Sequence, residues 1–187
     1  MPVKTIDLAE IRRTAIAALF SDEVLTEYLV LKGGNALNLV YGITSRTSMD
    51  LDFGMAHDFE DLAEVSSRVS FALLDRFDAA GYIMFDYKFE VCPDLKGPDE
   101  KPWWGGYMIS FKLIEREKYQ LHQGDITKLR NNSLALGSVG KRTFKIDLSK
   151  CEYTEGKAEH EIGNFAIYVY TPEMIAVEKL RAISADE

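Results

Sequence analysis

The residues best suited to chemistry lie in one short stretch, from Lys32 to Asp52. A glycine pair, Gly33-Gly34, directly follows Lys32, and two carboxylates, Asp50 and Asp52, stand one residue apart. Alternate side chains of a β-strand share one face, so we expect both carboxylates to point the same way. Two carboxylates about 4–5 Å apart near a protein surface repel each other by a few kcal/mol, unless one is protonated or a divalent cation lies between them. The spacing therefore predicts a metal site.

The glycine pair is suited to holding phosphates. Gly33 and Gly34 have no Cβ, so their backbone N–H groups can approach the oxygens of a triphosphate, and a helix that begins after them presents its positive end. Lys32, Arg46 and Ser48 are the cations and the hydroxyl placed to contact the same phosphates. The alternative for the glycines is a plain turn between a strand and a helix. The alternative for Arg46 is an ordinary loop cation.

Two residues from the second half of the chain complete the predicted catalytic set. Asp147 lies on the polar face of an alternating segment, and Lys179 lies beside apolar Leu180 in the last helical pattern. With Asp50 and Asp52, Asp147 would hold two Mg²⁺ or Mn²⁺ ions about 3.5–4 Å apart, and Lys179 would reach inward as a further cation. The alternative for Asp147 is a solvated strand face. The alternative for Lys179 is a surface lysine whose stem packs on apolar neighbours.

An alternation of helices and strands positions these side chains. Apolar spacing, capping residues and flanking glycines predict helices over 7–20, 21–28, 35–41, 58–80, near 115–130, and from 171 to the end. Alternation of apolar and polar residues, or a short apolar run, predicts strands over 28–31, 49–55, 82–91, 107–114, 142–148 and 165–170. In the strand over 49–55, Leu51 and Phe53 would point into the core, opposite the carboxylates.

Length and composition limit the class of protein. The chain has 187 residues, 47% hydrophobic and 28% charged, which fits one globular domain over residues 1–187. Its apolar runs are far shorter than the ~20 residues of a membrane span, and its first residues do not resemble a signal peptide. Two isolated cysteines favour a reducing cytoplasm. The net charge of −8 argues against a general affinity for nucleic acid, although local basic patches at 128–130 and 141–145 stay open.

Several of these residues belong to a known pattern. The segments concerned are Lys32–Leu37, Tyr41-Gly42, Arg46–Asp52, Lys145–Leu148 and Pro172–Ala182. Together they resemble the AbiEii/AbiGii toxin family of minimal nucleotidyltransferases. The first three are similar to the family's KGGTAL, YG and RxSxDxD elements, with Asn35 where threonine is usual. The fourth looks like the strand that carries a third acidic residue, and the last is similar to the family's EEIxAEKLxAL helix.

The resemblance implies an α+β fold with a polymerase-β-like nucleotidyltransferase core, a small mixed sheet flanked by helices with the active site on its open face. It implies a nucleoside triphosphate as substrate, RNA or tRNA as acceptor, and the role of toxin in a bacterial toxin–antitoxin or phage-defence pair, with an antitoxin protein as partner. Family members usually continue into a helical region with an RDxxDL-like motif. The sequence ends at Glu187 before such a motif, so we expect this C-terminal helical region to be missing.

Three functional hypotheses follow from these residues. The first is a metal-dependent nucleotidyltransferase that moves a nucleotidyl group from a nucleoside triphosphate to a hydroxyl and releases pyrophosphate. The second is a non-enzymatic nucleotide-binding relative that acts through partner contacts. The third is a nucleotide-sugar transferase, which also uses a DxD pair but releases a nucleoside diphosphate.

Overall fold

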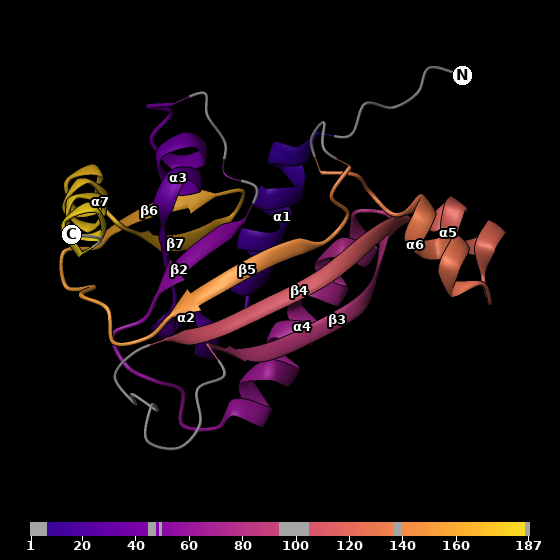
Figure 1. Cartoon of the computed structure of the whole chain (residues 1–187), viewed down its shortest axis with the longest axis horizontal. Coiled ribbons are helices and arrows are strands. Elements are labelled where there is room, and N and C mark those ends of the chain that lie inside the picture. The colour runs from indigo at the N-terminus through magenta and orange to yellow at the C-terminus, as the bar shows by residue number, and fades with distance from the viewer. Residues whose placement is uncertain (1–6, 45–47, 49, 94–104, 137–139, 186–187) are drawn as a thin grey trace.

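Seven strands form a single mixed sheet. The computed structural model describes residues 7–44, 48, 50–93, 105–136 and 140–185. Within these ranges the strands lie in the order β3-β4-β5-β2-β1-β7-β6 (Figure 1). Their bounds are β1 Val30–Lys32, β2 Leu51–Gly54, β3 Tyr82–Cys92, β4 Gly106–Glu115, β5 Phe144–Ser149, β6 Ala158–Ile162 and β7 Phe165–Val169. β2 runs parallel to β5 and β1 runs parallel to β7, whereas the other neighbouring pairs are antiparallel.

Helices cover one face of this sheet and flank its ends. In Figure 1, α1 and α4 lie behind the sheet, α7 lies beside β6 and β7, and α5 and α6 lie beyond the far end of β4. Their bounds are α1 Leu8–Leu19, α2 Glu23–Tyr28, α3 Gly33–Asn35, the π-helical turn η1 Ala36–Val40, α4 Leu62–Ala79, α5 Arg116–His122, α6 Ile126–Asn132 and α7 Pro172–Ala185. This arrangement confirms the predicted fold class, an α+β chain with a mixed sheet flanked by helices.

Aspartate caps begin four of these helices. The side chains of Asp7, Asp22, Asp61 and Asp125 each accept a hydrogen bond from a backbone N–H two or three residues later, at the starts of α1, α2, α4 and α6. A cap satisfies one of the donors that the first helical turn leaves unpaired, and it stabilises the helix by about 1 kcal/mol. Local sequence therefore fixes where each of these helices starts.

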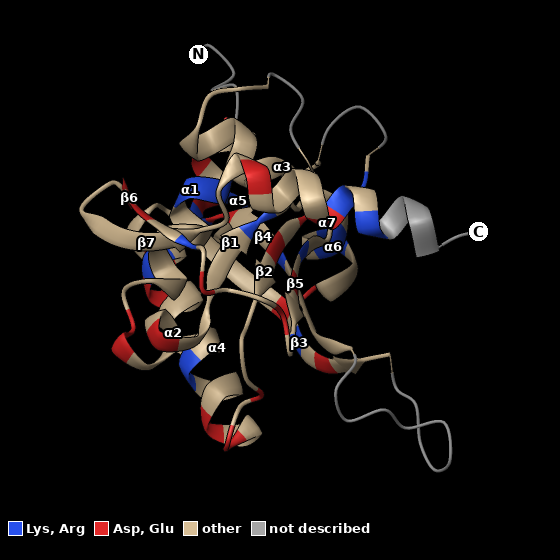
Figure 2. Cartoon of the chain, turned by 90° about the vertical axis from the view of Figure 1, so that its left-hand side faces the viewer, with Lys and Arg blue, Asp and Glu red and all other residues tan. Residues whose placement is uncertain are grey.

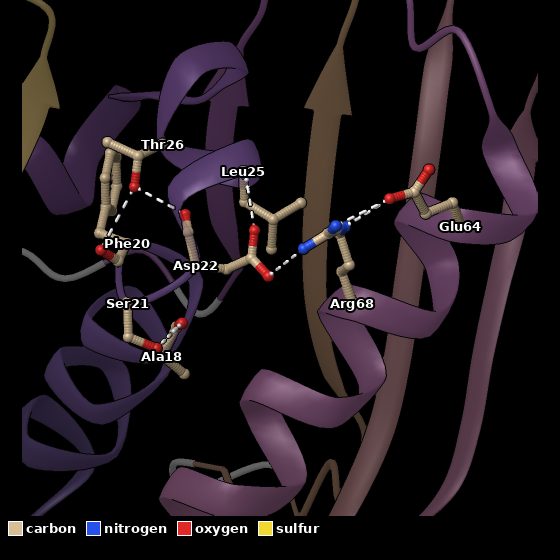
Figure 3. A network of polar contacts seen from close by, with 8 residues as sticks. All are labelled: Ala18, Phe20, Ser21, Asp22, Leu25, Thr26, Glu64 and Arg68. Atoms are coloured by element: carbon tan, nitrogen blue, oxygen red, sulfur yellow. Dashed lines mark hydrogen bonds and ion pairs between the residues drawn. The ribbon is translucent and has the colours of Figure 1, made fainter.

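Asp22 also joins two helices. One of its carboxylate oxygens accepts the Leu25 N–H at 3.0 Å, and the other lies 3.1 Å from Arg68 of α4 (Figure 3). Glu64, one turn earlier on α4, holds the same guanidinium at 2.8 Å. The Arg68 side chain thus fixes α2, which leads directly into β1, against the long helix that supports the sheet.

The sheet face that meets α1 and α4 is apolar. Strand register places Leu31, Phe53, Leu148 and Tyr107 in one row across β1, β2, β5 and β4, and all four are buried. Phe20, the C-cap of α1, packs on Phe53 with ring centroids 6.2 Å apart. Full burial of such a side chain contributes about 1.5–3 kcal/mol, so this row anchors the helices to the strands that carry the site.

The opposite face carries a polar row. One step along the strands from the apolar row, Lys32, Asp52, Asp147 and Met108 are cross-strand partners on β1, β2, β5 and β4. Alternate residues of a strand point to opposite faces, so this row lies on the side away from α1 and α4. The predicted alternation around Asp52 is confirmed, because both of its neighbours are buried.

Two boundaries near this row differ from the sequence prediction. The strand expected over 28–31 begins at Val30, because Tyr28 is the last residue of α2, where the predicted helix also ends, and Leu29 is its C-cap. The helix expected over 35–41 starts at the glycine pair and closes with a π-helical turn, in which the Tyr41 N–H donates to the Ala36 carbonyl at 3.2 Å. Such turns often occur at functional sites.

Later elements also differ from the prediction. The helix expected near 115–130 is two helices, because Gly124 adopts φ +91° and Asp125 caps a new helix. The helix expected over 58–80 starts only after its cap, at Leu62. The prediction contains no strand over Ala158–Ile162. β6 is an edge strand of which only the last residue is buried, so its apolar pattern is weak.

Charge is distributed over the surface. Figure 2 shows Asp and Glu beside Lys and Arg on several helices rather than gathered at one end. Cys92 and Cys151 are both exposed free thiols. Within the described ranges no helix combines the length and apolar character needed to span a bilayer.

Candidate active site

The two central strands bring two carboxylates together. Asp52 of β2 pairs in register with Asp147 of β5, and neighbouring strands lie about 4.8 Å apart. Burial raises the pKa of Asp52 to about 6, and the charges of Asp147 and Asp50 add to this effect, while Lys32 acts in the opposite direction. Burial and the charge of Asp50 also raise the pKa of Asp147. The three predicted carboxylates therefore act on one another across the polar face.

Asp50 lies at a bend just before β2, and cations and an amide surround it. Asn35 is fully buried, and its Nδ2 donates to the Asp50 carbonyl at 2.7 Å. Lys141, in the loop before β5, places its Nζ 3.3 Å from the Asp50 carboxylate. Arg12 of α1 is buried, which lowers its pKa, whereas the charges of Asp7 and Asp50 raise it. These groups position Asp50 and partly neutralise it.

The sequence prediction did not assign these three neighbours of Asp50 to the site. Asn35 gave a signal, because it directly follows the glycine pair and departs from the threonine of the family motif. Lys141 belongs to the basic patch noted at 141–145. Arg12 gave no signal, because an arginine inside a helix is ordinarily a surface cation.

The glycine turn lies directly against the carboxylates. Gly33 has φ +72°, a left-handed conformation that side chains rarely adopt, and a Cβ at this position would lie 2.6 Å from Asp52 Oδ2. A Cβ at Gly34 would lie 3.6 Å from the Cβ of Ser48. The structure thus brings Gly33, Gly34 and Ser48 to the same end of the polar row as Asp50 and Asp52.

Gly33→Ala is expected to damage this arrangement. The new methyl group would collide with the Asp52 carboxylate, and the left-handed backbone would add about 1–2 kcal/mol of strain. We expect a lower Tm, and an affinity for Mg²⁺–nucleoside triphosphate reduced about tenfold, the equivalent of about 1.4 kcal/mol. Gly42→Ala is the matched control, because Gly42 has φ +64° but no described atom within 4 Å of its Cβ position. Equal nucleotide affinity of the two variants in a calorimetric titration would contradict this expectation.

Lys32 belongs to the polar row, but its ammonium group is bound to carboxylates. Lys32 is only 7% exposed, and its Nζ lies 2.6 Å from Glu178 Oε1 of α7 and 3.4 Å from Glu152 Oε1. Lys179, the next residue of α7, is exposed. The structure therefore turns Glu178 toward the sheet and does not bring Lys179 into the row. Arg46 lies outside the described residues.

The donor set fits a divalent cation that arrives with a nucleotide. No group of three or more His, Cys, Asp or Glu residues in the described part of the chain forms a metal-binding cluster. Mg²⁺ is usually held by one or two carboxylates together with substrate phosphates and water, not by a cage made only of protein groups. Asp52 and Asp147, half-buried and mutually repelling, supply such a pair of hard oxygen ligands.

Comparison with solved structures finds a protein of similar fold. A crystal structure from H. pylori, of a protein assigned as a nucleotidyltransferase, matches with a TM-score of 0.50 and 18% sequence identity. The match covers 96% of this chain and 59% of that chain, so the chain spans little more than half the length of that relative. At this identity the likeness concerns the fold.

Sequence comparison gives the family. The family described as "Nucleotidyl transferase AbiEii toxin, Type IV TA system" matches residues 14–187. The chain belongs to this family, and the resemblance predicted from the glycine turn and the DxD pair is confirmed. A search of curated proteins finds no match.

Proposed function

We propose that the protein is a metal-dependent nucleotidyltransferase that moves a nucleotidyl group from a nucleoside triphosphate to a hydroxyl and releases pyrophosphate. One observation carries the proposal: Asp52 and Asp147 are in register on neighbouring strands, with the Gly33 backbone directly against Asp52. Family membership supports the same reaction class. Such a transfer needs alignment of the reactants and neutralisation of charge, which this row of groups provides.

Each group has a proposed part in the reaction. Asp52 and Asp147, with Asp50, would hold Mg²⁺ or Mn²⁺. A metal held there would lower the pKa of the attacking hydroxyl and would neutralise charge on the departing pyrophosphate. The N–H groups of Gly33 and Gly34 would bind triphosphate oxygens, which a Cβ would obstruct.

The remaining predicted residues would act through phosphate contacts. Ser48 lies beside Gly34 and can donate its hydroxyl. Arg46 and Lys179 are proposed as cations for the triphosphate. Lys32 would attract the triphosphate at the same end of the site, either after release from Glu178 or while still paired with it. Its charge already acts on Asp52. Lys179 would have to fold back from the exposed side of α7 to contribute.

The biological role is proposed from the family. Membership supports a toxin of a type IV toxin–antitoxin system, hence an antitoxin protein as partner and a role in phage defence. RNA, including the acceptor end of tRNA, is the proposed acceptor. The chain spans 59% of its structural relative, so activity and partners of the whole protein belong to this proposal.

Turnover of a labelled nucleoside triphosphate tests the reaction. With Mg²⁺ and total RNA, we expect transfer of label and release of pyrophosphate, and we expect Asp50→Ala to lower the rate by about 100-fold or more, the loss typical of one preorganised electrostatic contact. Asp75→Ala is the matched control, because Asp75 is exposed on α4. Wild-type protein that binds the nucleotide but releases no pyrophosphate would refute the proposal.

A non-enzymatic nucleotide-binding role is the second candidate. The observation that favours it is the binding of the Lys32 ammonium by Glu178 and Glu152, which leaves that cation committed to carboxylates. This role predicts nucleotide affinity without turnover. Release of a nucleoside diphosphate instead of pyrophosphate would indicate a nucleotide-sugar transferase.

A further inference from the structure

A cation-lined hollow lies on the same sheet face as the carboxylates. It has a volume of about 480 Å³ and is lined by Asp86, Tyr87, Lys88, Ser110, Lys112, Arg130 and Thr143. Three of these side chains are cations and one is a carboxylate, in a chain whose net charge is −8. The hydroxyls of Ser110 and Thr143 add neutral hydrogen-bonding groups. This mixture of cations and hydroxyls is suited to phosphate oxygens.

Strand register connects the hollow to the candidate active site. On β5 and the residue before it, Thr143, Lys145 and Asp147 alternate and so share one face. Lys145 pairs with Ser110 of β4, which pairs with Lys88 of β3. An extended chain rises about 3.3 Å per residue, so Thr143 lies roughly 13 Å along the strand from Asp147. Lys145 therefore stands between the carboxylates and the hollow.

Among the described residues, Lys88 and Lys112 of the hollow are held less closely by carboxylates than Arg130 is. Arg130 forms a two-pronged ion pair with Asp86, with Nε 2.7 Å from one oxygen and a terminal nitrogen 3.0 Å from the other. Lys112 donates to the hydroxyl of Thr143 at 2.7 Å, a neutral partner. Lys88 is exposed, and its Nζ lies 4.0 Å from Glu90 Oε1, at the far limit of an ion pair. Asp86 is thus paired with Arg130 and forms no ion pair with Lys88 or Lys112, although the charges of both lysines act on it.

The hollow and the glycine turn lie on opposite sides of the carboxylates. The glycine turn follows β1, whereas the hollow is lined from β3, β4 and the residue before β5. In the sheet, β2 lies between β5 and β1 (Figure 1), and β2 carries Asp52. In nucleotidyl transfer the attacking and leaving oxygens are roughly in line through the phosphorus. If the triphosphate lies over the glycine turn, the acceptor hydroxyl must approach from the side of β5. Cations roughly 13 Å from Asp147 would not contact a small neutral acceptor, whereas they would bind the phosphates of a polymer of phosphodiesters.

We propose that this hollow binds the phosphodiester backbone of a single-stranded nucleic acid acceptor, with Lys88 and Lys112 as its principal contacts. A strand lying there would pass Lys145 and present its terminal hydroxyl to the carboxylates. The acceptor role rests on the proposed nucleotidyltransferase function, but backbone binding does not depend on turnover.

Fluorescence anisotropy with a labelled strand of about 12 nucleotides tests the hollow directly. Each phosphate contact to a single strand contributes about 0.7 to the slope of log affinity against log salt. For Lys88→Gln with Lys112→Gln we expect a slope reduced by about 1.4, and roughly 25-fold weaker binding at 0.1 M salt. Arg13→Gln with Lys157→Gln, which also removes two cations but outside the hollow, should leave both quantities unchanged. Thermal unfolding confirms that each variant is folded.

Four arms decide the outcome. RNA and DNA strands of one sequence are compared. Weaker binding of either strand to the double variant than to wild type supports the backbone site, and the strand that is affected shows whether the hollow accepts ribose, deoxyribose or both. A strand with an uncharged backbone should bind weakly and be insensitive to the two substitutions. Mg²⁺–nucleoside triphosphate affinity should be unchanged in the double variant, and a parallel loss would overturn the proposal in favour of a triphosphate subsite. Unchanged RNA and DNA affinity would also overturn it. Absence of pyrophosphate release in wild type, with strand binding still weakened by the substitutions, would refute the enzyme but retain the hollow.

Discussion

Asp52→Asn is expected to abolish nucleotidyl transfer while making the protein more stable at pH 8. The amide removes a proposed metal ligand, and loss of about 4 kcal/mol of charge stabilisation corresponds to roughly a 1,000-fold lower rate. The gain in stability has a separate origin. In the ligand-free protein, Asp52 ionises at a cost, because it is half-buried beside Asp147 and Asp50.

The sign of the pH dependence follows from the pKa of Asp52. Folding raises this pKa from 3.8 to about 6, so the folded protein binds more protons between these values and ionisation of Asp52 opposes folding as the pH rises. The full difference is equivalent to about 3 kcal/mol, and partial exposure to solvent reduces it to about 1–2 kcal/mol. We expect the variant to match wild type near pH 4 and to melt roughly 2–6 °C higher at pH 8.

Asp58→Asn is the matched control with the opposite sign. Burial alone would raise the pKa of Asp58, but hydrogen bonds from Lys150, Tyr107 and the Phe59 N–H lower it overall. The charged form of Asp58 is therefore stabilised by folding, and its removal should lower the Tm at pH 8. Thermal unfolding of both variants from pH 4 to pH 8 measures the difference. A destabilised Asp52→Asn at pH 8 would show that the ionised form of Asp52 does not oppose folding.

Lys32→Met is expected to be the most destabilising single change at the site. The substitution leaves Glu178 and Glu152 without their shared cation and cuts the link between β1 and α7. Removing one partner of a buried ion pair costs about 3–5 kcal/mol. The two glutamates are partly exposed, with 34% and 27% of their side-chain surface accessible. We therefore expect a loss of about 2–3 kcal/mol and a Tm lower by roughly 5–10 °C.

A double-mutant cycle separates the charge effect from packing. Lys32→Met combined with Glu178→Gln leaves no strong unpaired charge at the shorter contact, so it should recover part of the stability lost in Lys32→Met. Guanidinium unfolding of the two single variants and the double variant gives the coupling free energy. Strictly additive effects would show that the Lys32–Glu178 contact is not energetically coupled.

Local chemistry explains how much of the fold could be predicted from the sequence. Asp7, Asp22 and the alternation around Asp52 are signals carried by a few neighbouring residues, and the corresponding elements lie close to the predicted places. Gly33 could be placed in a turn because glycine adopts left-handed backbone conformations at little cost, and its φ is +72°. β6 could not be predicted, because an edge strand with one buried residue has little apolar periodicity.

The candidate site, like the fold, could be predicted from the sequence only in part. Asp147 could be placed on the polar face of a strand from alternation alone, but its partnership with Asp52 depends on which strands are neighbours. The orientation of α7 could not be predicted, because Glu178 and Lys179 are adjacent and only packing decides which of them faces the sheet. The carboxylate pattern therefore indicated the candidate site, whereas the ion-pair partners of Lys32 and the positions of Lys141 and Arg12 beside Asp50 depend on tertiary structure.

The Lys32 ion pairs have a consequence for the order in which the parts of the chain fold during synthesis. The partners of Lys32 are 120 and 146 residues farther along the chain, and β1 completes its pairing only with β7. Contacts of such long range form slowly, because a large loop must close before they can contribute. During translation Lys32 would stay hydrated until Glu152 and Glu178 have been synthesised. The sheet face that carries the candidate site would therefore assemble only after nearly all of these residues have left the ribosome.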